Sequence, residues 1–311
     1  MTQPEVIAPG GLLLDARRMG VRVAHTIRDA DAASELVPAT ITLVAFLLLF
    51  WQPMYTLVRD WWSLPEAGHG LLLAPVAIWM AVKAGVRDDA KGNVTLGAAV
   101  LVVAVILRYM SGLAAELFTM RASMVLALGG LTIYRFGTRQ LRTWWLPYLL
   151  LWLCIPLPEL ITQAIALPLQ FKASQMGAAL LRMRDVPVRL TGNVIRIPGN
   201  ELFVTEACSG LRSLTALLSL AVLLGGLMLR RPFMRALLVL VAVPVAVAIN
   251  GVRVFFTGFF VYYIDPELGT GFMHLTEGWI LFVVSFALLA GTTWIAVRVE
   301  QIISAREVSR G

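Results

Sequence analysis

Three residues whose side chains could catalyse acyl transfer lie near the ends of apolar segments. Cys208 precedes Ser209 and Gly210 at the start of one segment, Arg253 lies near the end of another, and His274 is at the start of the last. A cysteine attacks as the thiolate, whose pKa falls below about 8.5 at a helix N-terminus or beside a cation. We therefore expect Cys208 to be the nucleophile.

The other two side chains of this set have matching roles. The His274 imidazole can take the thiol proton and return it to a leaving amine. The Arg253 guanidinium has a permanent charge and fixed donors, which suit an oxyanion or a substrate carbonyl. Asn250 lies one helical turn earlier on the same face and can orient Arg253. The supporting or substrate-binding candidates are Glu206, Ser209, Arg212, Asn250 and His69.

The remaining cysteine and one pair of charges have simpler explanations. Cys154 is flanked by apolar residues and is expected to pack in the core, although a disulfide with Cys208 in an oxidising compartment is an alternative. Glu116 and Arg121 are five residues apart and are interpreted as a structural pair rather than a proton path.

The composition indicates an integral membrane protein that must position these groups with helices. Of the 311 residues, 59% are apolar and 14% charged, whereas soluble domains have about 25% charged residues. We predict an all-α polytopic membrane protein with about eight transmembrane helices, because about 20 apolar residues cross the hydrocarbon layer. The predicted spans lie near 39–58, 69–86, 93–110, 113–134, 143–157, 209–229, 236–257 and 275–297.

The charge distribution predicts the orientation of these spans. With a cytoplasmic N-terminus, the inner tails and loops hold 16 of the 26 lysines and arginines, as the positive-inside bias requires. The net charge of +7 thus records orientation rather than a nucleic-acid partner. The predicted regions are a cytoplasmic tail at 1–35, an integral membrane domain at 36–298 and a cytoplasmic tail at 299–311.

The segment 158–206, between spans five and six, is predicted to lie on the outer face. Apolar residues at helical spacing, interrupted by polar ones, indicate one or two interfacial helices at 159–183. Residues 186–204 alternate and carry two turn signals, which indicates a small β-hairpin. Two cysteines and three histidines predict neither a metal site nor a cofactor site.

These motifs, taken together, resemble the exosortase/archaeosortase family of membrane transpeptidases. The match comprises Ala207-Cys208-Ser209-Gly210-Leu211-Arg212-Ser213, Asn250-x-x-Arg253, and His274 followed by Gly278-Trp279. It extends to Pro156-Leu157-Pro158-Glu159, Gly192-Asn193-Val194-Ile195 and Gly68-His69-Gly70, and covers about residues 40 to 297.

The resemblance implies a bacterial exosortase in the inner (plasma) membrane with its active site on the periplasmic face. It implies a cysteine peptidase that cleaves the C-terminal sorting tail of exported proteins, of the PEP-CTERM type. Cys208 would be the nucleophile, Arg253 the stabiliser of the oxyanion or substrate, and His274 the acid/base. The acceptor of the cleaved protein would be a lipid or polysaccharide, and water would make the enzyme a protease.

Two other classes of protein remain as alternatives. A multi-span transporter or channel would use Glu116, Arg253 and His274 as a path, but would need polar residues across the whole bilayer. A transferase of envelope polysaccharide assembly would need carboxylates, for which Asp265 and Glu267 are the outer-face candidates.

Overall fold

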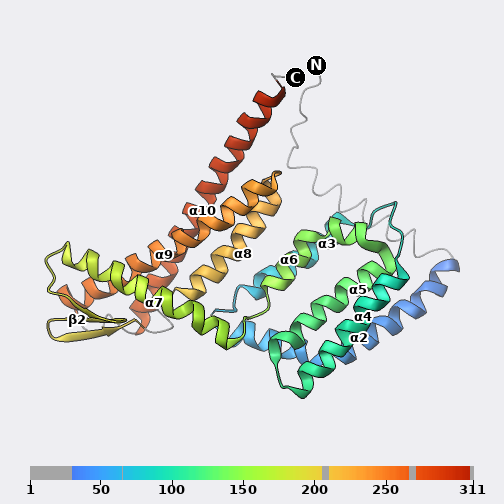
Figure 1. Ribbon diagram of the computed structural model, residues 1–311, viewed down its shortest axis with the longest axis horizontal. Helices are drawn as coiled ribbons and strands as arrows, with labels where there is room; N and C mark the ends of the chain where they lie inside the picture. The colour runs from blue at the N-terminus through green and yellow to red at the C-terminus, as the bar shows by residue number, and fades with distance from the viewer. Residues whose placement is uncertain (1–29, 65, 205–209, 266–270, 309–311) are drawn as a thin grey trace. The chain divides into compact units, whose positions relative to one another are not determined.

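The computed structural model describes residues 30–64, 66–204, 210–265 and 271–308, without the side chains of 30–35, 271–279 and 308. Helices make up most of this described part, with one small sheet within residues 189–203 (Figure 1). The chain divides into two compact units, residues 1–54 and 55–311. The helices are α2 (Ala30–Ser63), α3 (Gly70–Ala84), α4 (Val94–Leu113), α5 (Leu117–Thr143), α6 (Trp145–Leu153), α7 (Glu159–Arg182), α8 (Leu211–Met228), α9 (Pro232–Tyr263) and α10 (Gly271–Val308).

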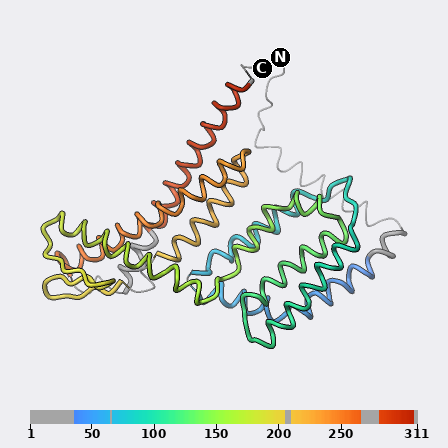
Figure 2. The backbone as a smooth tube through the Cα atoms, in the orientation of Figure 1, coloured from blue at the N-terminus to red at the C-terminus, as the bar shows by residue number. Residues whose placement is uncertain are grey.

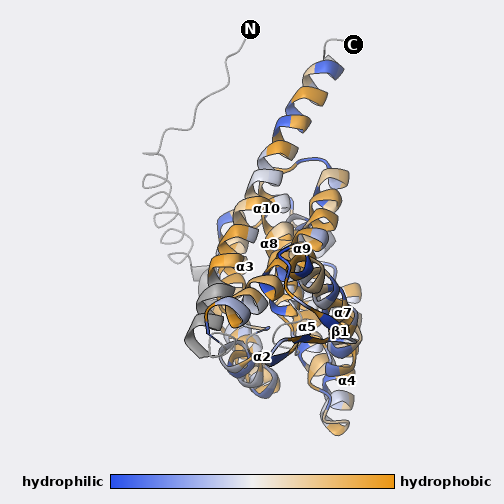
Figure 3. Ribbon diagram, turned by 90° about the vertical axis from the view of Figure 1, so that its left-hand side faces the viewer, coloured by the Kyte–Doolittle hydropathy of each residue, from blue (hydrophilic) through white to orange (hydrophobic). Residues whose placement is uncertain are grey.

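Within the described residues, six helical segments are long and apolar enough to cross a membrane. Hydrophobic residues run along their lengths (Figure 3), and about 20 helical residues span the hydrocarbon layer. These segments are Leu36–Ser63, Val94–Leu113, Leu117–Thr143, Leu211–Met228, Pro232–Tyr263 and Ile280–Glu307.

The other two predicted spans coincide with shorter helices, so the count of eight is not confirmed. Helix α3 has 15 residues and α6 has nine. The backbone of Gly137, with φ of 81°, breaks α5, and residues 138–153 after this break are helical except at Trp144. A Cβ at Gly137 would overlap the Lys91 carbonyl oxygen, so this sharp turn requires glycine. Hydropathy windows count apolar residues and do not register such a break.

The segment predicted to lie outside contains one long helix and a sheet. Helix α7 is continuous through Pro168 and packs along α9, where glycines allow a close approach. A Cβ at Gly177 would lie 2.5 Å from Val254 Cγ1, and one at Gly251 would lie 2.7 Å from Met176 Cβ. The interfacial position of α7 remains a prediction.

In place of the predicted hairpin at 186–204, the chain forms a three-stranded antiparallel sheet. Its strands are β1 (Arg189–Thr191), β2 (Val194–Ile197) and β3 (Asn200–Phe203), in the order β1-β2-β3. Both turn signals are used: Gly192 and Gly199 have φ of 63° and 80°, which only glycine adopts without strain. Ile195 and Ile197 face a core shared with Val254 of α9, so one face of the sheet is anchored on that helix.

The C-terminal helices α8, α9 and α10 run side by side (Figure 2) and share a second core. Leu217 and Leu289 are fully buried there. Glu300 of α10 accepts hydrogen bonds from the backbone N–H groups of Arg230 and Arg231, at 3.0 and 2.9 Å. This carboxylate fixes the turn between α8 and α9.

The predicted pairing of Glu116 with Arg121 is limited to an electrostatic attraction and is not the salt bridge of Arg121. Arg121 pairs instead with Asp60 at 2.6 Å, and both side chains are buried. Glu116 accepts hydrogen bonds from the N–H groups of Phe118 and Thr119, at 2.8 and 2.6 Å. These donors cannot be satisfied within α5, so the carboxylate serves as the helix cap rather than as an ion-pair partner.

Candidate active site

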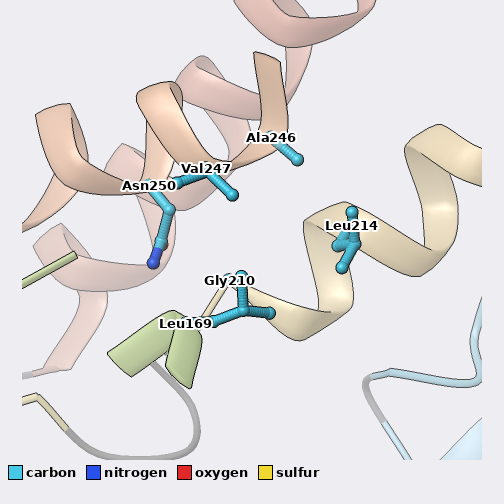
Figure 4. A pocket seen from close by; sticks show the side chains of 6 residues that line it. All are labelled: Leu169, Gly210, Leu214, Ala246, Val247 and Asn250. Carbon is cyan, nitrogen blue, oxygen red and sulfur yellow. The ribbon is translucent and has the colours of Figure 1, made fainter. Parts of the chain in front are cut away.

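The first turn of α8 lies directly against the middle of α9. Gly210 caps α8 with a φ of 80°, and a Cβ there would lie 2.5 Å from Cγ of Asn250. The Asn250 side chain extends from α9 beside Gly210 in a small crevice (Figure 4). Leu169, Leu214, Ala246 and Val247 complete the crevice. The sequence motif that contains Gly210 therefore packs on the motif that contains Asn250, as the candidate site requires.

Two arginines gather at this junction. Asn250 is 5% exposed, and Arg253 is half-buried with its Nε atom fully enclosed. Arg212, in the first turn of α8, is exposed and lies within electrostatic range of both Arg253 and Glu66. The structure thus brings together three predicted residues, Arg212, Asn250 and Arg253, and gives the junction a positive charge suited to a developing oxyanion.

The turn before α3 connects this junction to α6. Thr215 Oγ1 of α8 lies 3.3 Å from the Glu66 carbonyl oxygen, which places the turn against the start of α8. At the other end of the turn, His69 Nε2 lies 3.1 Å from the Leu153 carbonyl oxygen. Because a carbonyl only accepts, Nε2 carries the proton. The structure therefore assigns the His69 ring to capping the C-terminal end of α6.

Trp61 also binds the C-terminal end of α6, next to the carbonyl that His69 contacts. Its Nε1 donates to the Cys154 carbonyl oxygen at 2.7 Å, and its ring lies where a Cβ of Gly70 would otherwise be. A tryptophan that precedes a Gly-His-Gly motif gives no sign of its partner, which is 93 residues away.

Several predicted residues lie outside the described residues. Glu206, Cys208, Ser209 and Glu267 are among them. His274 lies in the first turn of α10, but its side chain is not described. Asp265, considered for a transferase, is exposed. The expected contacts of Cys208 with Arg253 and His274 thus lie outside the described residues.

Cys154 is a free thiol that is 2% exposed. It belongs to the core between α3 and α6, with Leu73 and Leu150. Among the described residues, no group of three or more histidines, cysteines and acids could hold a metal ion.

The chain matches a known family model. The model described as transmembrane exosortase covers residues 61–291, which include every candidate residue named above. No curated protein and no solved structure matches the chain significantly.

Proposed function

Because the chain belongs to the transmembrane exosortase family, we propose that it is a membrane-embedded cysteine transpeptidase acting on C-terminal sorting tails of exported proteins. Such a tail has a short recognition motif, a transmembrane helix and a basic end, of the PEP-CTERM type. The observation that best supports a site at this place is the packing of Gly210 on Asn250, because it joins the two motifs that carry Cys208 and Arg253.

The proposed roles follow from the distances that the chain itself imposes. Two residues span at most about 7 Å, so covalent connectivity keeps the Cα of Cys208 within that distance of Gly210. Arg253 is one helical turn beyond Asn250, a rise of about 4.5 Å along α9. A thiol and a guanidinium attached at these two points can therefore act on one substrate bond.

The reaction proceeds in two steps. His274 accepts the thiol proton as Cys208 Sγ attacks the scissile carbonyl, and Arg253 stabilises the oxyanion. The C–N bond breaks, His274 returns the proton to the leaving amine, and the tail helix is released. The exported protein is then held as a thioester. An amine or hydroxyl of a lipid or polysaccharide acceptor attacks this thioester and regenerates the thiol, whereas attack by water gives hydrolysis.

The membrane arrangement explains why such an enzyme is embedded. A substrate whose tail is a membrane helix presents its scissile bond close to the lipid boundary, so the nucleophile must act at that depth. In this proposal, the chain crosses the bacterial inner membrane eight times, with both termini in the cytoplasm. α3 and the predicted span at 143–157 complete the count, and the site opens on the periplasmic face.

The experiment is tail cleavage in cells that express the enzyme with a tagged substrate. Cys208→Ala is expected to abolish the shift in substrate mass while the enzyme inserts and accumulates normally. Cys154→Ala is the matched control: the same substitution at a buried cysteine is expected to leave cleavage nearly unchanged. Full cleavage by Cys208→Ala would overturn the proposal.

A further inference from the structure

The backbone leaves the small sheet at Val204, four residues before Cys208. The side chain of Asn193, which has no role in the proposed reaction, binds the backbone there. Asn193 is the second residue of the two-residue turn between β1 and β2, since Thr191 pairs with Val194 across that turn. The next residue, Val194, pairs with Phe203 of β3. In the same register, Asn193 lies opposite Val204, the first residue after β3.

Asn193 holds both backbone groups of Val204. The Val204 N–H donates to the Asn193 carbonyl oxygen at 3.0 Å, and the Asn193 side-chain Nδ2 donates to the Val204 carbonyl oxygen at 3.1 Å. In a regular antiparallel pair both bonds are made by the backbone. Here the side chain supplies the second bond, so the strand pairing is prolonged by one residue at the point where a turn would otherwise end it.

The amide of Asn193 is oriented by the neighbouring helix. Gln170 of α7 is 8% exposed, and its Oε1 lies 3.4 Å from Asn193 Nδ2. The two protons on Nδ2 thus have separate acceptors, the carbonyl of Val204 and the amide oxygen of Gln170. If the Asn193 amide were flipped, its oxygen would face both acceptor oxygens and could bond neither. The flip would therefore leave buried polar groups unsatisfied.

The helix that carries Gln170 is the one that packs most closely on α9. Met176 and Gly177 of α7 face Gly251 and Val254 of α9, with no space for added side-chain atoms. Arg253 lies between these two contact points on α9. Contacts therefore run from Val204 through Asn193 and Gln170 to α7, and from α7 to α9, which carries Asn250 and Arg253.

We propose that Asn193, oriented by Gln170, is a positioning residue that sets the register of the nucleophile segment relative to Arg253. The inference rests on the proposed function, because it takes Cys208 as the nucleophile. It assigns to the Gly192-Asn193 turn a task in catalysis beyond forming the sheet: the side-chain amide fixes the last backbone group before the segment that leads to Cys208.

The test compares Asn193→Ala with Asn200→Ala in purified, reconstituted enzyme carrying Cys154→Ala. Asn200 starts β3 at the other turn of the sheet, and its side chain makes no hydrogen bond among the described residues, so it is a matched control. Three quantities are measured: kcat and KM for a tail-bearing substrate, the melting temperature, and the pH dependence of Cys208 alkylation by iodoacetamide without substrate.

Asn193→Ala is expected to lower kcat on the order of 10²-fold, the cost of a displacement of about 1 Å, while KM changes less than about threefold. The midpoint of the alkylation profile is expected to rise toward the ordinary value of a thiol, about 8.5. Asn200→Ala should remain within about twofold of the parent in kcat.

Two results would overturn the inference: an unchanged kcat and alkylation profile in Asn193→Ala, or equal losses of kcat and melting temperature in both variants. A failure of the proposed function is recognised separately, because it would appear as cleavage by Cys208→Ala.

Discussion

The contact between Gly210 and Asn250 predicts that a single added methyl group disrupts the junction. In Gly210→Ala, the new Cβ would lie 2.5, 2.8 and 2.9 Å from Cγ, Nδ2 and Cβ of Asn250. Favourable carbon contacts are about 3.5–4.0 Å. Either α8 or the central turn of α9 must therefore move by about 1 Å, and Arg253 moves with that turn.

Two separate costs add up in this variant. A non-glycine residue at a φ of 80° costs on the order of 1–3 kcal/mol, and overpacking costs about 1–3 kcal/mol more. The control separates them. Gly199 has the same φ of 80°, and nothing lies within 4 Å of an added Cβ there. Gly199→Ala therefore incurs the backbone cost without the overlap.

The assay is tail cleavage by the two variants, together with their melting temperatures in detergent. Gly210→Ala should melt below Gly199→Ala and lose on the order of 10²-fold in kcat, because a 1 Å displacement of catalytic groups has that effect. Asn250→Ala combined with Gly210→Ala removes two of the three close contacts and should recover part of the melting temperature. Equal melting temperatures and equal cleavage rates for the two alanine variants would refute the contact between the motifs.

Two further predictions concern the charges that support the fold. Arg121→Met leaves the Asp60 carboxylate buried beside the more distant Arg59, and should destabilise the protein by about 3 kcal/mol or more. The Asp60→Leu/Arg121→Met double variant should recover part of this loss. Equal melting temperatures of the parent and the single variant would contradict the prediction. Glu116→Ala removes the α5 cap at a cost of about 1 kcal/mol. Burial raises the pKa of Glu116, but bonds from Thr119 and Phe118 outweigh this effect and lower it overall. The cap therefore stabilises the protein above the ordinary glutamate pKa of about 4.3 and loses this effect as pH falls through the lowered value. The melting-temperature difference between parent and Glu116→Ala should shrink in acid, and a difference that grows there would be contrary to expectation.

The sequence predicts the positions of the helices better than their lengths. Each predicted span overlaps a helix, because long apolar segments are a strong signal. The breaks depend on backbone geometry: Gly137 adopts a left-handed φ against Lys91, and nothing in the local pattern distinguishes it from a glycine within a helix. The two turns of the sheet are predictable because Gly192 and Gly199 mark them. The pairing of β3 with β2 is not, because it depends on the register between the two strands.

In the candidate site, the motif residues are predictable and their partners are not. Arg212, Asn250 and Arg253 meet as the motifs suggest. The motif around His69 marks this residue as a candidate, but its contact with the Leu153 carbonyl is a tertiary one. The Asp60–Arg121 pair joins residues 61 positions apart, whereas local spacing favoured Glu116. Long-range polar contacts of this kind carry no periodic signal in a single sequence.

The most direct test of the central claim is detection of the acyl-enzyme. Purified enzyme is mixed with a tail-bearing substrate, quenched in acid and analysed by intact and peptide mass spectrometry. The account predicts an adduct on Cys208 equal in mass to the substrate without its tail, cleaved by hydroxylamine and missing in Cys208→Ser. Tail release with no adduct in the parent, at an undiminished rate in Cys208→Ser, would contradict it.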